Sequence, residues 1–184
     1  MTSKPKRRHK VRAPSIATVK AVAVFAASLI VFFWALNNRW ADAHIFSPFT
    51  GLVAVVTTWI FKAAGQTASC AGSSVMVNGT SLSIAQGCNG LEAVALYFAA
   101  VLAMPTRWNR RLIGLAIGLV GIFLINQIRV VGLFLVAMLK PEFIPYAHNY
   151  AGQTFVILMG MALWYFWAEN YAGFGLGQTH AAPR

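Results

Sequence analysis

Long uncharged apolar runs alternate with short polar segments along this chain. Ala21–Leu36 and Leu112–Ile125 are two such runs, and neither contains a charged residue. A hydrocarbon core about 30 Å thick is crossed by about 20 apolar helical residues, so runs of this kind need lipid as their solvent. The pattern predicts an all-α integral membrane protein.

The same pattern predicts about four transmembrane helices. We expect them at residues 16–36, 91–104, 112–139 and 151–167. The span at 112–139 exceeds one crossing by about eight residues, so we expect a break or kink near Asn126, Gln127 and Arg129. A polar turn is expected at 140–150.

A polar segment at about 65–87 predicts a small β-hairpin. Apolar residues alternate with polar ones on both sides of Asn78-Gly79, a pair that favours a two-residue turn. These apolar residues are Val75, Val77, Leu82 and Ile84. The hairpin must lie on another part of the protein, since an isolated hairpin is marginal in water.

The composition agrees with a membrane location. Hydrophobic residues make up 58% of the chain and charged residues 10%, against about 25% charged residues in soluble domains. The net charge is +11, but six basic residues lie in Lys4–Arg12 and three in Arg107–Arg111. Basic clusters beside apolar runs are typical of cytoplasmic loops, so no nucleic-acid partner is expected.

The positions of these clusters set the expected topology. If the apolar stretch at 49–64 crossed the membrane, the 107–111 loop would face outward, against the charge rule. We therefore expect 49–64 to form a re-entrant or interfacial helix at the outer face, with the hairpin on that side. The predicted organisation is a cytoplasmic basic tail at 1–14, a membrane domain at 15–168 whose first span is an uncleaved anchor, and a tail at 169–184.

Cys88 is the first candidate for chemistry. It precedes the predicted helix at 91–104, and both a helix N-terminus and nearby cations lower the pKa of a thiol. The alternative is that Cys88 packs as a small apolar residue. A disulfide with Cys70 is a further possibility in an oxidising compartment.

Arg129 and His148 are expected at the same depth as Cys88. A charged residue inside a span costs about 3 kcal/mol on insertion scales, so Arg129 either snorkels to lipid phosphate or serves the protein interior. Asn126 shares its helical face. His148 is either structural or a proton carrier. Glu92 could pair with Arg129, orient His148, or interact with the helix N-terminus. No zinc-type spacing is present, and no cofactor is expected.

Three short motifs occur in order along these segments. They are Gly87-Cys88-Asn89-Gly90-Leu91, Asn126-Gln127-Ile128-Arg129 and His148-Asn149-Tyr150-Ala151-Gly152. They resemble the Cys-x-Gly-Leu, Asn-x-x-Arg and His-x-x-x-Gly elements of the exosortase/archaeosortase family of membrane transpeptidases. The likeness covers about Val75–Trp167 and is greatest to the short exosortase H subclass, although better-known members are larger.

The resemblance implies a cysteine transpeptidase or protease of the bacterial inner membrane. Its partners would be the lipid bilayer and exported proteins that end in a sorting motif, a transmembrane helix and a basic tail, of PEP-CTERM type or an Ile-Pro-Thr-Leu-like variant. Cys88 would form an acyl-thioester that an unidentified cell-surface acceptor resolves, with Arg129 and His148 as the other catalytic residues. Asn126 and Glu92 would support them.

A different class of function also fits the residues. A small membrane transporter or assembly subunit could use Arg129 to bind an anion or a partner while Cys88 only packs.

The predicted topology can be tested by labelling. A membrane-impermeant thiol reagent should label Cys88 or Cys70 in intact cells, because both are expected near the outer face. Labelling that requires permeabilised cells would contradict this orientation.

Overall fold

The structure is a computed structural model that describes residues 15–84 and 87–173 of the chain. The expected tail at 1–14 and residues 174–184 of the expected C-terminal tail lie outside the described residues. The helices are α1 (Ile16–Leu36), α2 (Arg39–Ala41), α3 (Ser47–Ala63), α4 (Leu91–Ala103), α5 (Trp108–Leu139), α6 (Ile144–Tyr146) and α7 (Gln153–Trp167), and the strands are β1 (Ala68–Ala71), β2 (Ser74–Val77) and β3 (Thr80–Ser83).

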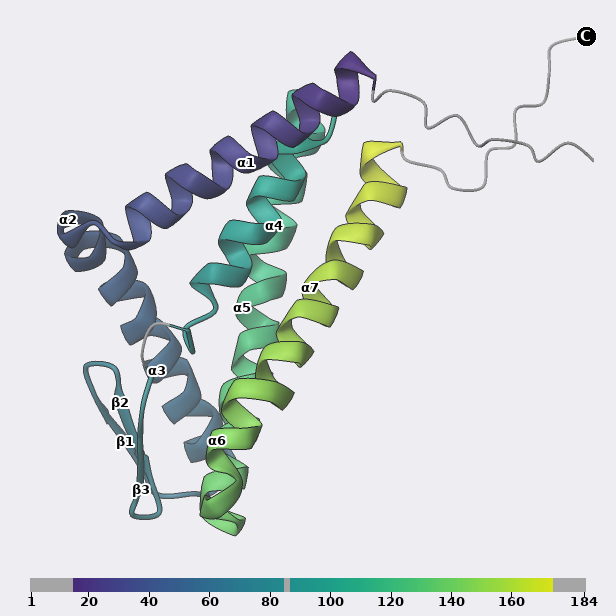
Figure 1. Ribbon diagram of the computed structural model, residues 1–184. Coiled ribbons are helices and arrows are strands. Elements are labelled where there is room, and N and C mark those ends of the chain that lie inside the picture. Colours follow the sequence, from purple (N-terminus) through teal and green to yellow (C-terminus); the bar gives the residue numbers. More distant parts are fainter. Residues whose placement is uncertain (1–14, 85–86, 174–184) are drawn as a thin grey trace, which may run out of the picture.

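Helix α5 is the longest of the described helices, and it contacts α3, α4, α7 and β3. Its 32 residues correspond to about 48 Å of helix. Its N-terminal half packs against α4 and α7, and its C-terminal half lies beside α3 and the sheet (Figure 1). The expected break near Asn126 is wrong, because α5 continues through the polar residues as one α-helix. Their side chains bond to neighbouring elements, so the helix backbone does not have to open.

Two hydrophobic clusters pack the two halves of α5 against different neighbours. One joins α3, the sheet and α5, with Val53, Val77 and Phe134 fully or almost fully buried. The other joins α4, α5 and α7, with Ile122 and Trp167 at its centre. Each half of α5 therefore has its own packing partners.

The first predicted span is confirmed as helix α1, with the expected bounds. The Ser15 hydroxyl oxygen accepts a hydrogen bond from the Thr18 N–H at 3.2 Å and caps the helix. None of the residues of α1 is buried, and the helix packs mainly along α4. Apart from Thr18 and Lys20 near the start of the helix, the exposed residues of α1 are apolar, as a lipid-facing helix requires.

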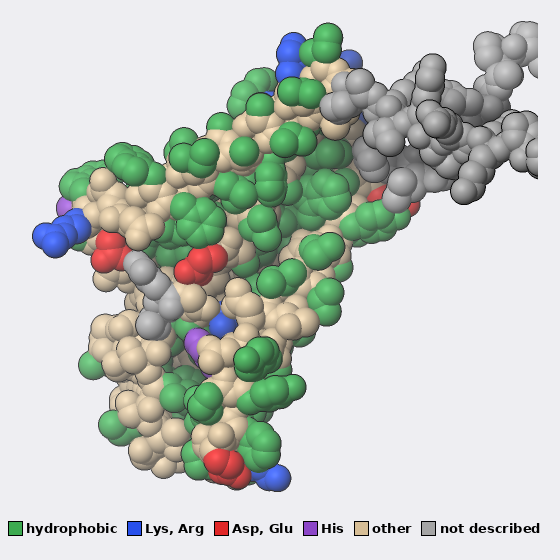
Figure 2. Space-filling view, viewed as in Figure 1, with side chains coloured by type: hydrophobic (Ala, Val, Ile, Leu, Met, Phe, Trp, Pro, Cys, Tyr) green, Lys and Arg blue, Asp and Glu red, His purple; other side chains and the backbone are tan. Residues whose placement is uncertain are grey.

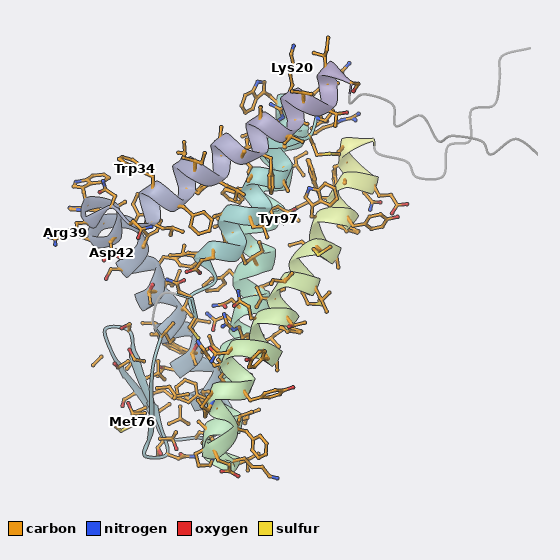
Figure 3. The ribbon with its side chains drawn as sticks, viewed as in Figure 1. Lys20, Trp34, Arg39, Asp42, Met76 and Tyr97 are labelled. Carbon is orange, nitrogen blue, oxygen red and sulfur yellow. The ribbon has the colours of Figure 1, made fainter. Side chains whose placement is uncertain are left out.

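The predicted hairpin is confirmed as β2 and β3, which pair antiparallel. Asn78 and Gly79 both have positive φ, 50° and 83°, which is the backbone of a type I′ turn. Val75 and Val77 are fully buried while Met76 is 48% exposed. Figure 3 shows Met76 on the sheet. A third strand, β1, pairs with β2, and it was not predicted because Ala68–Ala71 has no alternating pattern.

Four helical runs among the described residues are long and apolar enough to cross a membrane. They cover Ile16–Leu36, Arg39–Ala63, Trp108–Leu139 and Pro141–Ala172. All but the last residue of the expected interfacial stretch at 49–64 lies within the second run. Helix α4 is shorter than these runs and has 13 residues. The expected turn at 140–150 is wrong beyond Lys140, because the chain is helical from Pro141 onward.

Three glycines of α5 let bulky side chains approach its backbone. A Cβ added at Gly118 would lie 2.1 Å from the Tyr97 ring, and one at Gly114 would lie 2.5 Å from the Trp167 ring. Tyr97 projects from α4 and is labelled in Figure 3. Gly121 makes the same kind of contact with Leu163. These close contacts fix α4 and α7 against α5.

Substitutions of glycine by alanine in α5 should therefore change the stability in opposite directions, depending on what the added Cβ meets. We expect Gly118→Ala to lower the stability by about 1–3 kcal/mol through overpacking against Tyr97. Gly132→Ala is the matched control, because nothing lies within 4 Å of its added Cβ and alanine favours helix by up to about 1 kcal/mol. Thermal unfolding in detergent measures both. Equal effects of the two substitutions would contradict this packing.

Candidate active site

Cys88 lies in a tight turn before α4. Gly87 and Gly90 have φ values of +83° and +82°, which glycine adopts without steric penalty. A Cβ at Gly90 would also lie 3.0 Å from Cγ of Asn126. The turn therefore needs glycine at Gly90 for its conformation and for its packing, and it leaves Cys88 only 7% exposed.

Asn89 fastens the turn to two helices. Its Oδ1 accepts a hydrogen bond from the Leu91 N–H at 3.2 Å, and its Nδ2 donates to Oγ1 of Thr50 in α3 at 3.0 Å. Asn89 is 2% exposed, so these bonds satisfy a buried amide. The sequence analysis did not identify Asn89 or Thr50 as site residues, although Asn89 lies inside the cysteine motif.

Asn126 and Arg129 hold the turn from α5. Asn126 donates from Nδ2 to the Cys88 carbonyl oxygen at 3.1 Å, and Arg129 donates from Nη1 to the Gly87 carbonyl oxygen at 2.8 Å. Both side chains are buried. This geometry agrees with the expectation that Asn126 and Arg129 share one interior-facing stripe. Arg129 is buried and bonded to Gly87, so it does not snorkel to lipid phosphate.

A second buried polar contact lies one helical position away. Thr57 of α3 donates from Oγ1 to Oε1 of Gln127 at 2.9 Å. Gln127 and Thr57 are both buried. This bond joins α3 to the middle of α5, next to the residues that hold the turn, and neither partner was predicted as a site residue.

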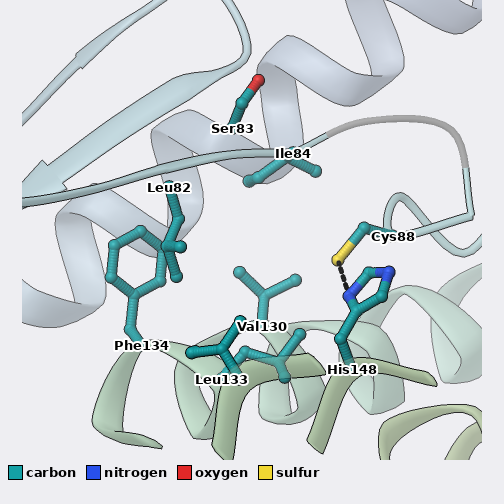
Figure 4. A pocket seen from close by; sticks show the side chains of 9 residues that line it. Leu82, Ser83, Ile84, Cys88, Val130, Leu133, Phe134 and His148 are labelled. Carbon is teal, nitrogen blue, oxygen red and sulfur yellow. Dashed lines mark hydrogen bonds between the residues drawn. The ribbon is translucent and has the colours of Figure 1, made fainter. Parts of the chain in front are cut away.

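His148 faces the thiol from the other side. Its Nδ1 lies 3.7 Å from Sγ of Cys88, as Figure 4 shows. His148 belongs to a short π-helical segment, Ala147–Gly152, that leads into α7. A Cβ at Gly152 would lie 2.9 Å from Nε of Arg129. The segment Ala147–Gly152 therefore places the His148 imidazole beside Cys88, and the absence of a side chain at Gly152 lets the Arg129 side chain pack against it.

Glu92 has a structural contact within the turn. Its Oε1 accepts a hydrogen bond from the Gly87 N–H at 2.9 Å. Within the described residues, no ion pair or hydrogen bond joins Glu92 to Arg129 or to His148, so the two expected pairings are not formed. Its carboxylate instead fixes the start of the turn, close to the N-terminus of α4.

The surroundings of Cys88 favour the neutral thiol. Burial raises the pKa of the Cys88 thiol; the Arg129 charge lowers that pKa, and the Glu92 charge raises it, with a net increase over the ordinary value. The thiol therefore needs a base to become a nucleophile. His148 is within reach of that proton.

Cys70 lies exposed on β1, and both cysteines are free, so the possible disulfide is not formed.

Two cavities meet at the turn. A small pocket of about 60 Å³, which we call the β3–α5 pocket, has Cys88 and His148 in its wall and is lined by Leu82, Ile84, Val130, Leu133 and Phe134. A groove of about 580 Å³, the α1–α4–α7 groove, runs from Arg129 and Glu92 along apolar side chains that include Phe25, Leu29, Leu96, Met161 and Trp164. Figure 2 shows a hollow with basic and histidine side-chain atoms and, above it, hydrophobic side chains over α1, α4 and α7.

Comparison with known proteins places the chain in a family. Residues 11–166 match the family model described as Transmembrane exosortase. No curated protein and no solved structure matches the chain. Because the family model covers most of the chain, this protein belongs to the exosortase family. It is a multi-pass membrane protein of that family.

The opposite effects of Arg129 and Glu92 on the thiol can be tested by alkylation. In a Cys70→Ser background, Cys88 is the sole cysteine, and iodoacetamide reacts with its thiolate. The rate should rise toward alkaline pH. Arg129→Gln should move the profile to higher pH, and Glu92→Gln should move it to lower pH.

The charge-retaining Arg129→Lys variant is the control, and the plateau rate at high pH reports access to the thiol separately from its pKa. Profiles of Arg129→Gln and Glu92→Gln that shift in the same direction would contradict the electrostatic description of the site.

Proposed function

We propose that this protein is a cysteine-dependent membrane transpeptidase or protease. The observation that carries the proposal is the 3.7 Å approach of the Cys88 thiol to the His148 imidazole, on a turn that Asn126 and Arg129 hold in place. A nucleophile within reach of a base, with a fixed cation beside it, is the arrangement that acyl transfer needs.

The first chemical step forms an acyl-thioester. Nδ1 of His148 takes the thiol proton, and Sγ of Cys88 forms a bond to the carbonyl carbon of the substrate peptide. The carbon–nitrogen bond then breaks, and the imidazolium returns the proton to the leaving amine. An acceptor amine or water attacks the thioester in the second step and releases the thiol.

Arg129 serves electrostatically in this scheme. A guanidinium stays protonated at any ordinary pH, so His148 is the better proton carrier. The fixed charge of Arg129 favours the thiolate and the oxyanion that develops on the attacked carbonyl. Asn126 and Glu92 position the turn through the Cys88 carbonyl and the Gly87 N–H and do not touch the reacting atoms.

The α1–α4–α7 groove supports a substrate with an apolar segment next to the cleaved bond. The groove is almost wholly apolar and one end of it is formed by Arg129, Gly87 and Gly90. A transmembrane helix that follows a sorting motif would place the motif at Cys88. We therefore propose exported proteins with a C-terminal motif, helix and basic tail as substrates, cleaved at the outer face of a bacterial inner membrane with the N-terminus of the enzyme in the cytoplasm.

Substitution of Cys88 tests the proposed activity. The enzyme is co-expressed with an exported protein from the same organism that ends in such a motif, helix and tail, and processing is followed by gel shift. Cys88→Ala and Cys88→Ser should abolish processing, because alanine has no nucleophile and a serine hydroxyl is far less acidic.

Cys70→Ser is the matched control and should leave processing unchanged. Normal processing by Cys88→Ala would refute the nucleophile and favour the alternative of a non-enzymatic membrane subunit.

A further inference from the structure

The β3–α5 pocket is a small apolar cavity whose wall contains the sulfur of Cys88. Leu82 and Ile84 come from strand β3 and the residues after it, and Val130 and Leu133 come from α5, as Figure 4 shows. This pocket lies on the sheet side of the cysteine turn, whereas the α1–α4–α7 groove lies on the side of Arg129. The two cavities therefore lie on opposite sides of the cysteine turn, and Cys88 itself lines only the β3–α5 pocket.

The pocket is suited to an uncharged side chain. No Lys, Arg, Asp or Glu lines it, so a charged side chain placed there would lose its hydration and would find only His148 and Cys88 as titratable neighbours among the lining residues. Its volume of about 60 Å³ corresponds to about four to six water-sized positions. A pocket of this size suits one small apolar side chain, whereas the α1–α4–α7 groove of about 580 Å³ suits a longer segment.

The position of the sulfur decides which substrate residue reaches the pocket. When Sγ bonds to the attacked carbonyl carbon, the Cα of that same residue is the next atom along the acyl chain and its Cβ follows. The side chain on the amine side of the broken bond begins farther from the sulfur. The side chain of the acyl residue therefore begins nearest to the sulfur and to the pocket that has Cys88 in its wall.

We propose that the β3–α5 pocket binds the side chain of the residue whose carbonyl Cys88 attacks, and that it selects a branched aliphatic side chain. The proposal rests on the proposed acyl-transfer function. Residues Leu133, Val130 and Ile84 then determine specificity, while the groove on the opposite side of the turn holds the rest of the substrate.

Small electrophiles test this selection without a known substrate. In the Cys70→Ser background, N-acetyl-aminoacyl chloromethyl ketones with Gly, Leu, Phe or Asp side chains alkylate Cys88; Sγ displaces chloride and forms a thioether. The rates are followed by intact-protein mass. Each rate is divided by the rate of the same protein with iodoacetamide, which corrects for the reactivity of the thiol. The corrected rate of the Leu reagent should be at least about 10-fold higher than those of the other three.

Two variants locate the effect in the pocket. Leu133→Ala enlarges it and should bring the Phe reagent to at least the rate of the Leu reagent. Ile144→Arg places a cation in the wall of the pocket, which the half-buried Ile144 also lines, and should raise the Asp-to-Leu rate ratio about 10-fold. Leu135→Ala is the matched control, because Leu135 is 47% exposed on the same helix and should leave every ratio unchanged.

Equal rates for all four reagents, or a ratio that either Leu133→Ala or Ile144→Arg leaves unchanged, would overturn the proposal. A normal iodoacetamide rate in each variant shows that the fold and the thiol are intact. The outcome is separable from the proposed function: if Cys88→Ala still processed its substrate, the activity would be refuted whatever the reagents show, and an essential Cys88 without selectivity would refute only the pocket.

Discussion

The site depends on two hydrogen bonds that cross from α5 to the backbone of the cysteine turn. Asn126 and Arg129 donate to the carbonyl oxygens of Cys88 and Gly87 at 3.1 and 2.8 Å. In an apolar interior each of these polar groups would be strongly unfavourable without a partner. The same bonds therefore stabilise buried polar side chains on α5 and, together with the hydrogen bonds of Asn89 and Glu92, fix the position of Cys88.

This arrangement explains why a charged residue is retained in the middle of a long apolar helix. Arg129 does not contact Cys88 through a hydrogen bond to sulfur; it binds the neighbouring carbonyl and acts on the thiol through its charge. Burial acts in the opposite direction and raises the pKa of that thiol. Burial therefore favours the neutral thiol, and in the proposed mechanism His148 is the group that removes its proton.

The two halves of the molecule contribute different parts of the site. The α3 and sheet half supplies Thr50, which binds Asn89, and the strand residues that close the β3–α5 pocket. The α1, α4 and α7 half supplies the groove that leads to Arg129. Helix α5 belongs to both halves. Tight contacts at Gly114, Gly118 and Gly121 set α4 and α7 close to α5, so packing far from Cys88 fixes the width of the groove.

The sequence by itself determined the membrane class, the bounds of α1 and the hairpin around Asn78-Gly79, and it supplied Cys88, Arg129 and His148 as predicted site residues. Each of these follows from local chemistry: apolar length, turn preference, and the rarity of polar groups beside apolar runs. Tertiary structure alone decided the rest. The continuity of α5, the strand β1, the helical start at Pro141 and the bond from Glu92 to Gly87 depend on partners distant in the chain or on backbone geometry that no local pattern encodes. The expected break in α5 was wrong because its polar side chains find acceptors on other elements, and only the folded chain brings those acceptors within reach.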